Sequence, residues 1–224
     1  MAAVNAFYNL RCCNLHLINS ASIILIPKKD GAETVGDFRP ISLIHSFIKI
    51  ITKTLALRLA PRMNEIISPF QSAFIKSRSI HENFLAVRST IRRFQRNNSP
   101  TLFIKLDIAK AFDSVRWDYL ISLLDSLGFP VRWIDWIATI LYTSSSRVTV
   151  NGVPNPPIRH GRGLRQGDPL SPLLFVLAID PLQKILNIVA ESGALSKLGN
   201  RSPILRISLY ADDAALFVKP KRGN

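Results

Sequence analysis

The segment SLYADDAALFVKP, residues 208–220, constrains the fold of this chain more than any other stretch. Two strand-like runs, ILRISLY (204–210) and AALFVK (214–219), flank the adjacent carboxylates of Asp212 and Asp213. Such runs around a short connection predict a β-hairpin. Because aspartate is common in turns, the hairpin alone leaves two interpretations open, an ordinary turn and a metal-binding site.

A third carboxylate ends a strand-like run upstream, TLFIKLD (101–107), in which alternate residues face opposite sides. If this strand neighbours the hairpin, Asp107 converges with the other two aspartates. Like charges this close repel, whereas Mg²⁺ prefers oxygen ligands and serves phosphoryl transfer as a pair of ions. Adjacent strand residues point to opposite faces, so Asp212 and Asp213 are not equivalent, and the residues alone do not rank them. The alternative role for Asp107 is to cap a helix.

Helical and strand-like segments alternate along the rest of the chain. Strands are expected at 22–31 and around the Asn-Gly turn of 147–153. Helices are expected over 46–67 with a break at Pro61, over 80–96, from a cap at Ser114 to Gly128, over 131–142 and over 171–186. This mixture predicts an α+β fold.

The charge predicts a polyanionic partner. The chain carries 29 basic and 15 acidic residues, a net charge of +14, which suits nucleic acid or an anionic membrane face. Cys12 and Cys13 are adjacent and cannot form a disulfide framework, which fits a reducing, intracellular compartment. The longest apolar run, 173–179, is far shorter than a membrane span, and the N-terminus lacks the features of a signal peptide.

Two further segments carry candidate ligand-binding residues. GRGLRQGDPLSP (161–172) fits neither a dinucleotide fingerprint nor a phosphate-binding P-loop. It leaves a glycine loop that could lie against a base pair or a phosphate, or an ordinary surface loop. IPKKDG (26–31) and DFRP (37–40) supply cations suited to a triphosphate, although charged turn residues are common.

Taken in order, five motifs resemble those of reverse transcriptases. LIPKKDG, DFRPISL, LDIAKAFDSV, GLRQGDPLSPLLF and YADD are most similar to the polymerase of non-LTR (LINE-type) retrotransposons of plants, from about residue 22 to 219. The resemblance implies the fingers and part of the palm of a right-hand polymerase, with mixed or antiparallel sheet and packed helices. It implies an unassigned segment at 1–21, a basic fingers-like region at 22–100 and a palm-like catalytic region at 101–224. We expect the thumb, an endonuclease and a zinc knuckle to be absent.

The resemblance also assigns roles to residues. Asp107 and Asp212 would be the main catalytic metal ligands, Asp213 a less direct one, and Ile108 would lend its backbone carbonyl. Two Mg²⁺ ions, or Mn²⁺, are the implied cofactors. The residues implied to bind the incoming dNTP are Lys28, Arg39, Phe112, Gln166 and Gly167, with Phe112 excluding a ribose 2′-OH or, equally naturally, packing in the core. The arginines expected to bind nucleic acid are Arg88, Arg92, Arg93, Arg162 and Arg165.

The implied function is RNA-directed DNA polymerase, a nucleotidyltransferase that adds dNTPs to a DNA primer 3′-OH on an RNA template. A non-catalytic, nucleic-acid-binding remnant of a retrotransposon is the alternative. An RNA-dependent RNA polymerase is a third hypothesis, against which Phe112 argues. We expect an intracellular protein, in cytoplasm or nucleus, without a membrane partner. Whether a partner chain supplies a thumb or an endonuclease is left open by the sequence.

Overall fold

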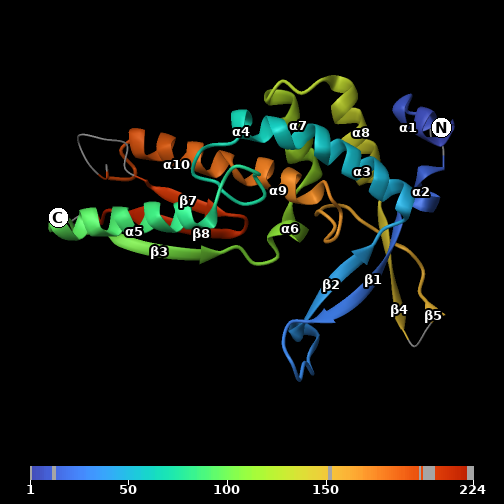
Figure 1. Ribbon diagram of the computed structural model, residues 1–224, viewed down its shortest axis with the longest axis horizontal. Helices are drawn as coiled ribbons and strands as arrows, with labels where there is room; N and C mark the ends of the chain where they lie inside the picture. The colour runs from blue at the N-terminus through green and yellow to red at the C-terminus, as the bar shows by residue number, and fades with distance from the viewer. Residues whose placement is uncertain (1, 12–13, 151–152, 197, 199–204, 221–224) are drawn as a thin grey trace. The chain divides into compact units, whose positions relative to one another are not determined.

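The computed structural model describes residues 2–11, 14–150, 153–196, 198 and 205–220. The cysteines Cys12 and Cys13 and the expected turn residues Asn151 and Gly152 lie outside the described residues. The chain divides into two compact units, each built from two separate segments (Figure 1). The first unit is Met1–Leu59 with Phe112–Leu174, and the second is Ala60–Ala111 with Phe175–Asn224. The expected division at residue 100 stays a prediction.

The first unit mixes helices and strands. Its elements are α1 (Ala2–Tyr8), α2 (Leu15–Ile18), β1 (Ser20–Pro27), the 3₁₀ turn η1 (Val35–Asp37), β2 (Phe38–Leu43), α3 (Ser46–Leu59), most of α6 (Ala111–Ser114), α7 (Trp117–Ser126), α8 (Val131–Tyr142), β4 (Ser145–Val150), β5 (Val153–Pro154), β6 (Ile158–Arg159) and the start of α9 (Ser171–Ile179).

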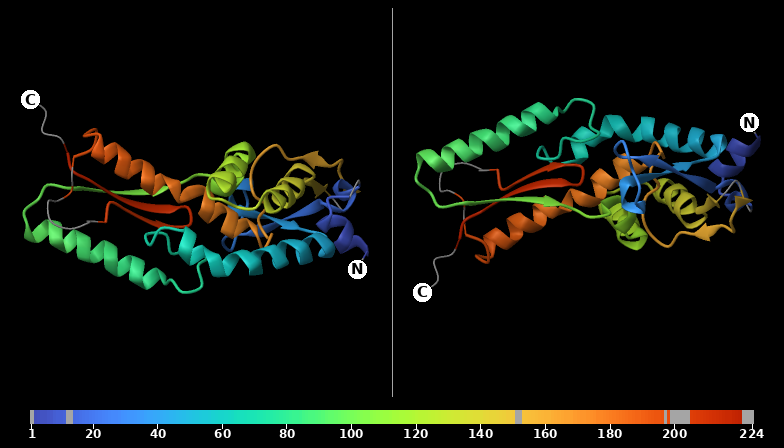
Figure 2. Two further views of the ribbon diagram at one scale, coloured as in Figure 1. Left: turned by 90° about the horizontal axis from the view of Figure 1, so that it is seen from above. Right: turned by 90° about the horizontal axis from the view of Figure 1, so that it is seen from below.

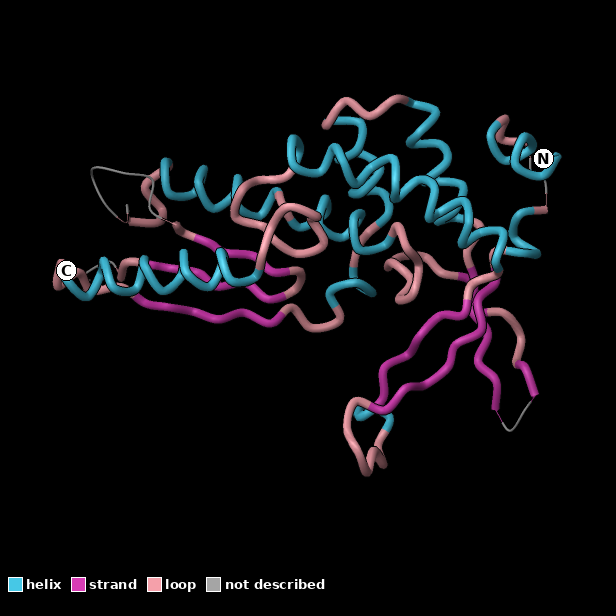
Figure 3. The backbone as a smooth tube through the Cα atoms, viewed as in Figure 1, coloured by secondary structure: helices cyan, strands magenta, loops and turns pink. Residues whose placement is uncertain are grey.

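A five-stranded sheet runs through the first unit in the order β2-β1-β4-β5, with β6 also paired to β4 (Figure 3). β1 is antiparallel to β2, from Ser22 opposite Leu43 to Pro27 opposite Phe38. β1 is parallel to β4, and parallel neighbours need a long connection, which here contains α3, α7 and α8. The mixed sheet confirms the expected α+β class.

Helix α3 confirms the helical spacing seen after residue 46. Ile48, Ile51, Leu55 and Leu59 are buried, and their spacing places them on one face of the helix. The helix ends just before Pro61, where a 3₁₀ turn, η2 (Ala60–Arg62), takes over. A proline inside a helix removes one N–H donor and clashes with the preceding turn, so the expected break is confirmed.

The helix expected to start from a cap at Ser114 begins later, which is a correction. Ser114 is the last residue of α6, and α7 starts at Trp117 after Arg116, whose side chain makes no capping bond. The side chain of Arg116 pairs with Asp118 instead. At the other end of α7, Gly128 has φ of +75°, a conformation that glycine adopts without strain and that commonly ends helices.

The second unit is built around a three-stranded antiparallel sheet. Its elements are η2, α4 (Met63–Ile66), α5 (Ile80–Arg96), β3 (Leu102–Asp107), the end of α9, α10 (Pro181–Glu191), β7 (Ile207–Tyr210) and β8 (Asp213–Val218). The strand order is β3-β8-β7. The predicted hairpin is therefore confirmed as β7 and β8. The strand that ends at Asp107 pairs with β8, so the condition for Asp107 to approach the hairpin is met.

Helices α5 and α10 cover opposite faces of this sheet (Figure 2). On one face, Phe94 of α5 packs against Phe217 of β8. On the other face, Leu182 and Leu186 of α10 contact a cluster formed by Ile207, Leu209 and Ala214. Residues of opposite parity along β8 thus meet different helices. The residues of β3 remain exposed on both faces.

The helix expected over residues 171–186 is broken into α9 and α10 at Asp180, directly before Pro181. By length and composition alone, Ser171–Glu191 is one stretch among the described residues that could cross a membrane. This is weak evidence for a span, because Phe175, Val176 and Leu177 are buried inside the protein. The carboxylate of Asp180 accepts a hydrogen bond from the backbone of Ser68.

Candidate active site

The hairpin of the second unit turns through two residues, Ala211 and Asp212. Tyr210 pairs with Asp213 across the turn, and Ala211 has φ of +53°. Two-residue hairpin turns need a positive φ at their first position, where glycine is the usual residue. Alanine there carries a Cβ close to the backbone, so the turn that precedes Asp212 is strained.

Asp107 and Asp213 face each other across β3 and β8. Directly opposed residues of antiparallel strands point to the same face of a sheet. The next ladder bond runs from Ile108 N to Asp212 O, at 3.3 Å. This makes Asp107 and Asp213 a non-hydrogen-bonded pair, in which side chains approach most closely.

This register bears on the ranking of the two adjacent aspartates. Asp213 shares the face of Asp107, whereas Asp212 lies in the turn. The register therefore gives no support to the expectation that Asp212 outranks Asp213 as a ligand, and that ranking stays a prediction.

Lys105 places a positive charge beside this carboxylate pair. It lies two residues before Asp107 on β3, and its Nζ is 3.2 Å from Asp213 Oδ1. The side chains are 70% and 52% exposed, so the pair contributes at most about 1 kcal/mol to stability. Its importance is local, because one positive charge lies beside two facing carboxylates.

The convergence of the three carboxylates on a metal stays a prediction, because the structure shows no preformed cluster in the part of the chain that it describes. No group of three or more His, Cys, Asp or Glu side chains is arranged to hold a metal ion among the described residues, which include all three aspartates. Two features account for this: the turn separates Asp212 from the facing pair, and Lys105 engages Asp213. The donor set still fits Mg²⁺ in its chemistry, because it consists of carboxylate oxygens.

In the first unit, the glycine loop is fixed against the chain around α6. Gly163 N donates to Val115 O at 2.8 Å, and Trp117 Nε1 donates to Gly163 O at 2.8 Å. A Cβ on Gly163 would lie 2.8 Å from Asp113 O, a distance that real side chains do not reach. Leu164 N donates to Phe112 O at 2.8 Å. The loop therefore requires glycine at 163 to lie this close to the backbone.

The end of the same loop lies against β2. Gly167 has φ of +100°, and a Cβ there would be 3.0 Å from Ser42 O. Ser42 N donates to Gln166 O at 2.9 Å. A hollow of about 250 Å³ in the first unit is bordered by Ser42, Asp113, Arg162 and Gln166 among others. Gln166 and Arg162, two predicted ligand-binding residues, thus line one hollow.

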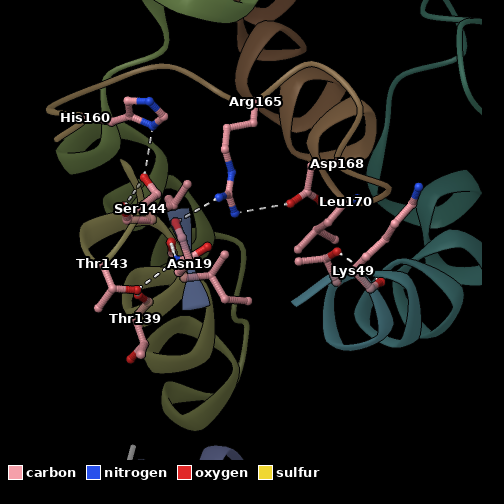
Figure 4. A network of polar contacts seen from close by, with 12 residues as sticks. Asn19, Lys49, Thr139, Thr143, Ser144, His160, Arg165, Asp168 and Leu170 are labelled. Atoms are coloured by element: carbon pink, nitrogen blue, oxygen red, sulfur yellow. Dashed lines mark hydrogen bonds and ion pairs between the residues drawn. The ribbon is translucent and has the colours of Figure 1, made fainter. Parts of the chain in front are cut away.

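Arg165, predicted to bind nucleic acid, is buried (Figure 4). Its Nη2 lies 3.6 Å from Asp168 Oδ2, its Nη1 donates to Asn19 O at 3.2 Å, and the side chains of Arg165 and Asp168 are 7% and 5% exposed. Burial lowers the pKa of Arg165 and raises the pKa of Asp168, where hydrogen bonds from Leu170 N–H and the charge of Arg165 oppose the rise. A contact between Arg165 and nucleic acid is therefore not favoured by this structure.

The residues predicted to grip a triphosphate lie at the β1–β2 end of the first unit. Lys28 Nζ donates to Gly36 O at 2.8 Å, and Lys29 pairs with Asp37 at 2.8 Å. Lys29, and then Thr34, lower the pKa of Asp37 to about 2. Lys28 and Arg39 are exposed. Phe112 is half-buried at the start of the first unit's second segment.

Exposed arginines follow one side of α5 in the second unit. Arg88, Arg92, Arg93 and Arg96 border a hollow of about 680 Å³. Among the residues that the structure describes, none of the four pairs with a carboxylate. Their spacing of three to four residues gathers the charges on neighbouring positions of the helix surface.

Residues 26–223 match the family described as "Reverse transcriptase (RNA-dependent DNA polymerase)". The chain belongs to the reverse transcriptase family. It is 34% identical over 201 residues to the "Transposon TX1 uncharacterized 149 kDa protein" of Xenopus laevis, covering 89% of this chain and 15% of that protein. It is 32% identical over 215 residues to the "Retrovirus-related Pol polyprotein from type-2 retrotransposable element R2DM" of Drosophila melanogaster, covering 96% and 20%.

These relatives confirm the resemblance to non-LTR reverse transcriptases, whereas its plant-like part is not borne out by the frog and fly proteins. The chain spans a fifth or less of either relative. Among solved structures, apo telomerase from Candida tropicalis matches with a TM-score of 0.62 at 10% identity, covering 91% of this chain and 40% of that chain. Telomerase from Candida albicans matches with a TM-score of 0.59 at 11% identity, covering 98% and 42%. These likenesses confirm the right-hand polymerase fold.

The sequence did not point to two residues that lie beside Asp213 and the hairpin turn in this structure, Lys105 and Gln71. Lys105 was seen only as a member of the alternating strand, although its position two residues before Asp107 already places it on the same face. Gln71 gave no signal, because its neighbour in space is the hairpin turn, 140 positions further along the chain.

Proposed function

We propose that this chain is the catalytic region of a retrotransposon reverse transcriptase that extends a DNA primer 3′-OH with dNTPs on an RNA template. The observation that carries the proposal is the facing pair of Asp107 and Asp213, with Asp212 adjacent in the strained turn. The family match and the positive net charge of +14 support it.

Asp107, Asp212 and Asp213 would hold two Mg²⁺ ions, with the carbonyl of Ile108 as a further oxygen donor. When bound, such ions activate the attacking oxygen and stabilise the leaving group. Until then, the ammonium of Lys105 offsets part of the repulsion between the facing carboxylates. Asp107 and Asp213 are both exposed, so their carboxylates are accessible to solvent and substrate.

In the first unit, Lys28 and Arg39 would bind the triphosphate of the incoming nucleotide. Gln166 and Gly167 would contact the base pair. Phe112 would exclude a sugar that carries a 2′-OH. These assignments are supported by the exposure of two of the side chains and by the hollow that a third borders. The lysine and arginine side chains are exposed, and Gln166 borders the 250 Å³ hollow together with Arg162. Guanidinium and ammonium groups suit phosphate oxygens.

The arginines of α5 give a separate expectation. The double variant Arg88→Gln/Arg92→Gln should bind single-stranded RNA more weakly, because each lost phosphate contact reduces counterion release. The slope of log affinity against log salt should become less negative by about 1.4. Fluorescence anisotropy from low to physiological salt measures the slope. Arg62→Gln is the control, because Arg62 pairs with Glu65, and an unchanged slope in the double variant would contradict the assignment.

Primer extension tests the proposed function directly. The chain is incubated with an RNA template, a DNA primer, Mg²⁺ and either dNTPs or ribonucleotides. We expect extension with dNTPs only. RNA binding without extension at any protein concentration would favour the alternative, a nucleic-acid-binding remnant, for which the arginines of α5 are the specific support.

A further inference from the structure

We infer that Gln71 positions the catalytic turn by holding the backbone of Ala211, a role that rests on the proposed polymerase function. The side chain of Gln71 is fully buried in the second unit. Its Oε1 accepts hydrogen bonds from Ala211 N at 3.3 Å and from Ala73 N at 3.0 Å. Ala211 directly precedes Asp212, so the amide of Gln71 contacts the residue that orients a catalytic carboxylate.

The orientation of this amide is fixed by its partners. Two backbone N–H donors converge on one side-chain oxygen, and a flipped amide would present its NH₂ group to both of them. The Nε2 atom of Gln71 is buried and makes no hydrogen bond to any described residue. Methionine or leucine would fill the space without this desolvated donor, so packing alone does not explain a glutamine here. The acceptor oxygen is the feature that the site uses.

The backbone of Gln71 is docked on the hairpin itself. Leu209 N donates to Phe70 O at 2.8 Å, and Ser72 N donates to Leu209 O at 3.2 Å. These bonds form a parallel bridge between Gln71 and Leu209 of β7. The side chain of Gln71 therefore has only to reach two residues along β7 to meet the turn.

The side chains of Arg78 and Asp180 hold the backbone of residues 67–71 in place through hydrogen bonds. The guanidinium of Arg78 donates to Ile67 O at 2.9 Å, to Gln71 O at 2.6 Å and to Ser68 O. Asp180 Oδ1 accepts from Ser68 N at 3.0 Å. Arg78 thus donates a hydrogen bond to the backbone carbonyl of Gln71 itself. The backbone of Gln71 is therefore held in place while its side-chain Oε1 accepts the hydrogen bond from Ala211.

The strain in the turn explains why such a contact is needed. Ala211 has φ of +53°, a conformation that an alanine keeps only when its surroundings impose it. The backbone angles of Ala211 set the direction in which the next residue, Asp212, leaves the turn. A hydrogen bond to the N–H of Ala211 holds those angles, and its loss should let Asp212 move.

The test replaces Gln71 by methionine and follows the Ala211 amide by NMR hydrogen exchange. We expect this amide to exchange at least about tenfold faster, while Leu209 and Phe217 keep their protection. Mn²⁺ affinity, measured by paramagnetic relaxation, should weaken several-fold. In primer extension, kcat should fall by about 10- to 100-fold with little change in the KM for dNTP, because misplacement rather than substrate binding is affected.

Three comparisons make the result decisive. Gln183→Met is the matched control, a buried glutamine of the same unit whose Oε1 accepts no hydrogen bond from any described residue, and it should leave Ala211 exchange unchanged. Gln71→Glu keeps an acceptor at the same reach and should keep the amide protected, even if Gln71→Met fails to fold. Adding Ala211→Gly to Gln71→Met should restore part of the Mn²⁺ affinity, because glycine adopts a positive φ without cost.

Unchanged Ala211 exchange in a folded Gln71→Met, or an unprotected amide in Gln71→Glu, would overturn the role of Gln71. Exchange and Mn²⁺ binding need no turnover. A wild-type chain that never extends a primer would therefore refute the proposed function, while the exchange data would still decide whether Gln71 holds the turn.

Discussion

Asp107→Asn is expected to lower primer extension by at least about 10³-fold, which corresponds to about 4 kcal/mol of transition-state stabilisation. Asparagine keeps the shape of the side chain but removes the charge that would bind Mg²⁺ opposite Asp213. The same change removes one of two facing like charges, so the free energy of unfolding should stay constant or rise by up to about 1 kcal/mol. Extension assays and urea unfolding on the same preparations measure both quantities.

The opposite directions of the two effects separate catalysis from folding. Glu191→Gln, on an exposed side chain at the end of α10, is the control and should change neither quantity. Asp212→Asn and Asp213→Asn, assayed alongside, rank the adjacent carboxylates, since the family resemblance favours Asp212 and the register favours Asp213. Full extension by Asp107→Asn would refute the catalytic role of this face of the sheet.

Arg165→Met is expected to destabilise the protein by about 3–5 kcal/mol, because it leaves the buried carboxylate of Asp168 without its cation. Unfolding in urea with probes in the first unit, such as Trp133, measures the loss. The charge of Arg165 opposes the rise that burial causes in the pKa of Asp168, so its removal should raise that pKa further.

The pH dependence follows from the direction of that shift. A carboxyl whose pKa is raised on folding contributes most stability below its unfolded pKa of about 3.9, and the contribution is lost as pH rises through the folded pKa. Arg165→Met should therefore be less destabilised in mild acid than at neutral pH.

The control for this second expectation is the double variant Arg165→Met/Asp168→Asn. It removes both charges, so it should recover part of the stability and lose the added pH dependence. Equal stability of the single and double variants at pH 7 would show that the ion pair does not hold this loop.

The sequence predicted the parts of this fold that depend on local pattern. Alternation predicted β3, and two strand-like runs around a short connection predicted β7 and β8. The resemblance to reverse transcriptases implied that Asp107 and the hairpin share one site. The break at Pro61 and the stop at Gly128 follow from backbone chemistry that a single residue dictates.

The remaining features depend on register and burial, which a pattern does not carry. A shift of one residue in the pairing would have placed Asp212 opposite Asp107. Arg165 looked like a surface cation in a glycine loop, yet the fold closes over it and Asp168. Gln71 shares no sequence neighbourhood with the turn that it supports. In each case the environment of the residue is set by a partner distant in the sequence or by burial in the folded chain.

Because the segments of the two units alternate along the chain, neither unit can complete its fold until the second half of the chain has been synthesised. Each unit needs an early and a late segment, and β3 leaves the ribosome about 100 residues before its partner β8. At typical elongation rates this wait lasts on the order of 5–20 s. Throughout it, Leu102, Ile104 and Leu106 would sit on an unpaired strand of the kind that recruits other chains. The nascent protein therefore has a vulnerable interval that ends only when the hairpin with its two aspartates emerges.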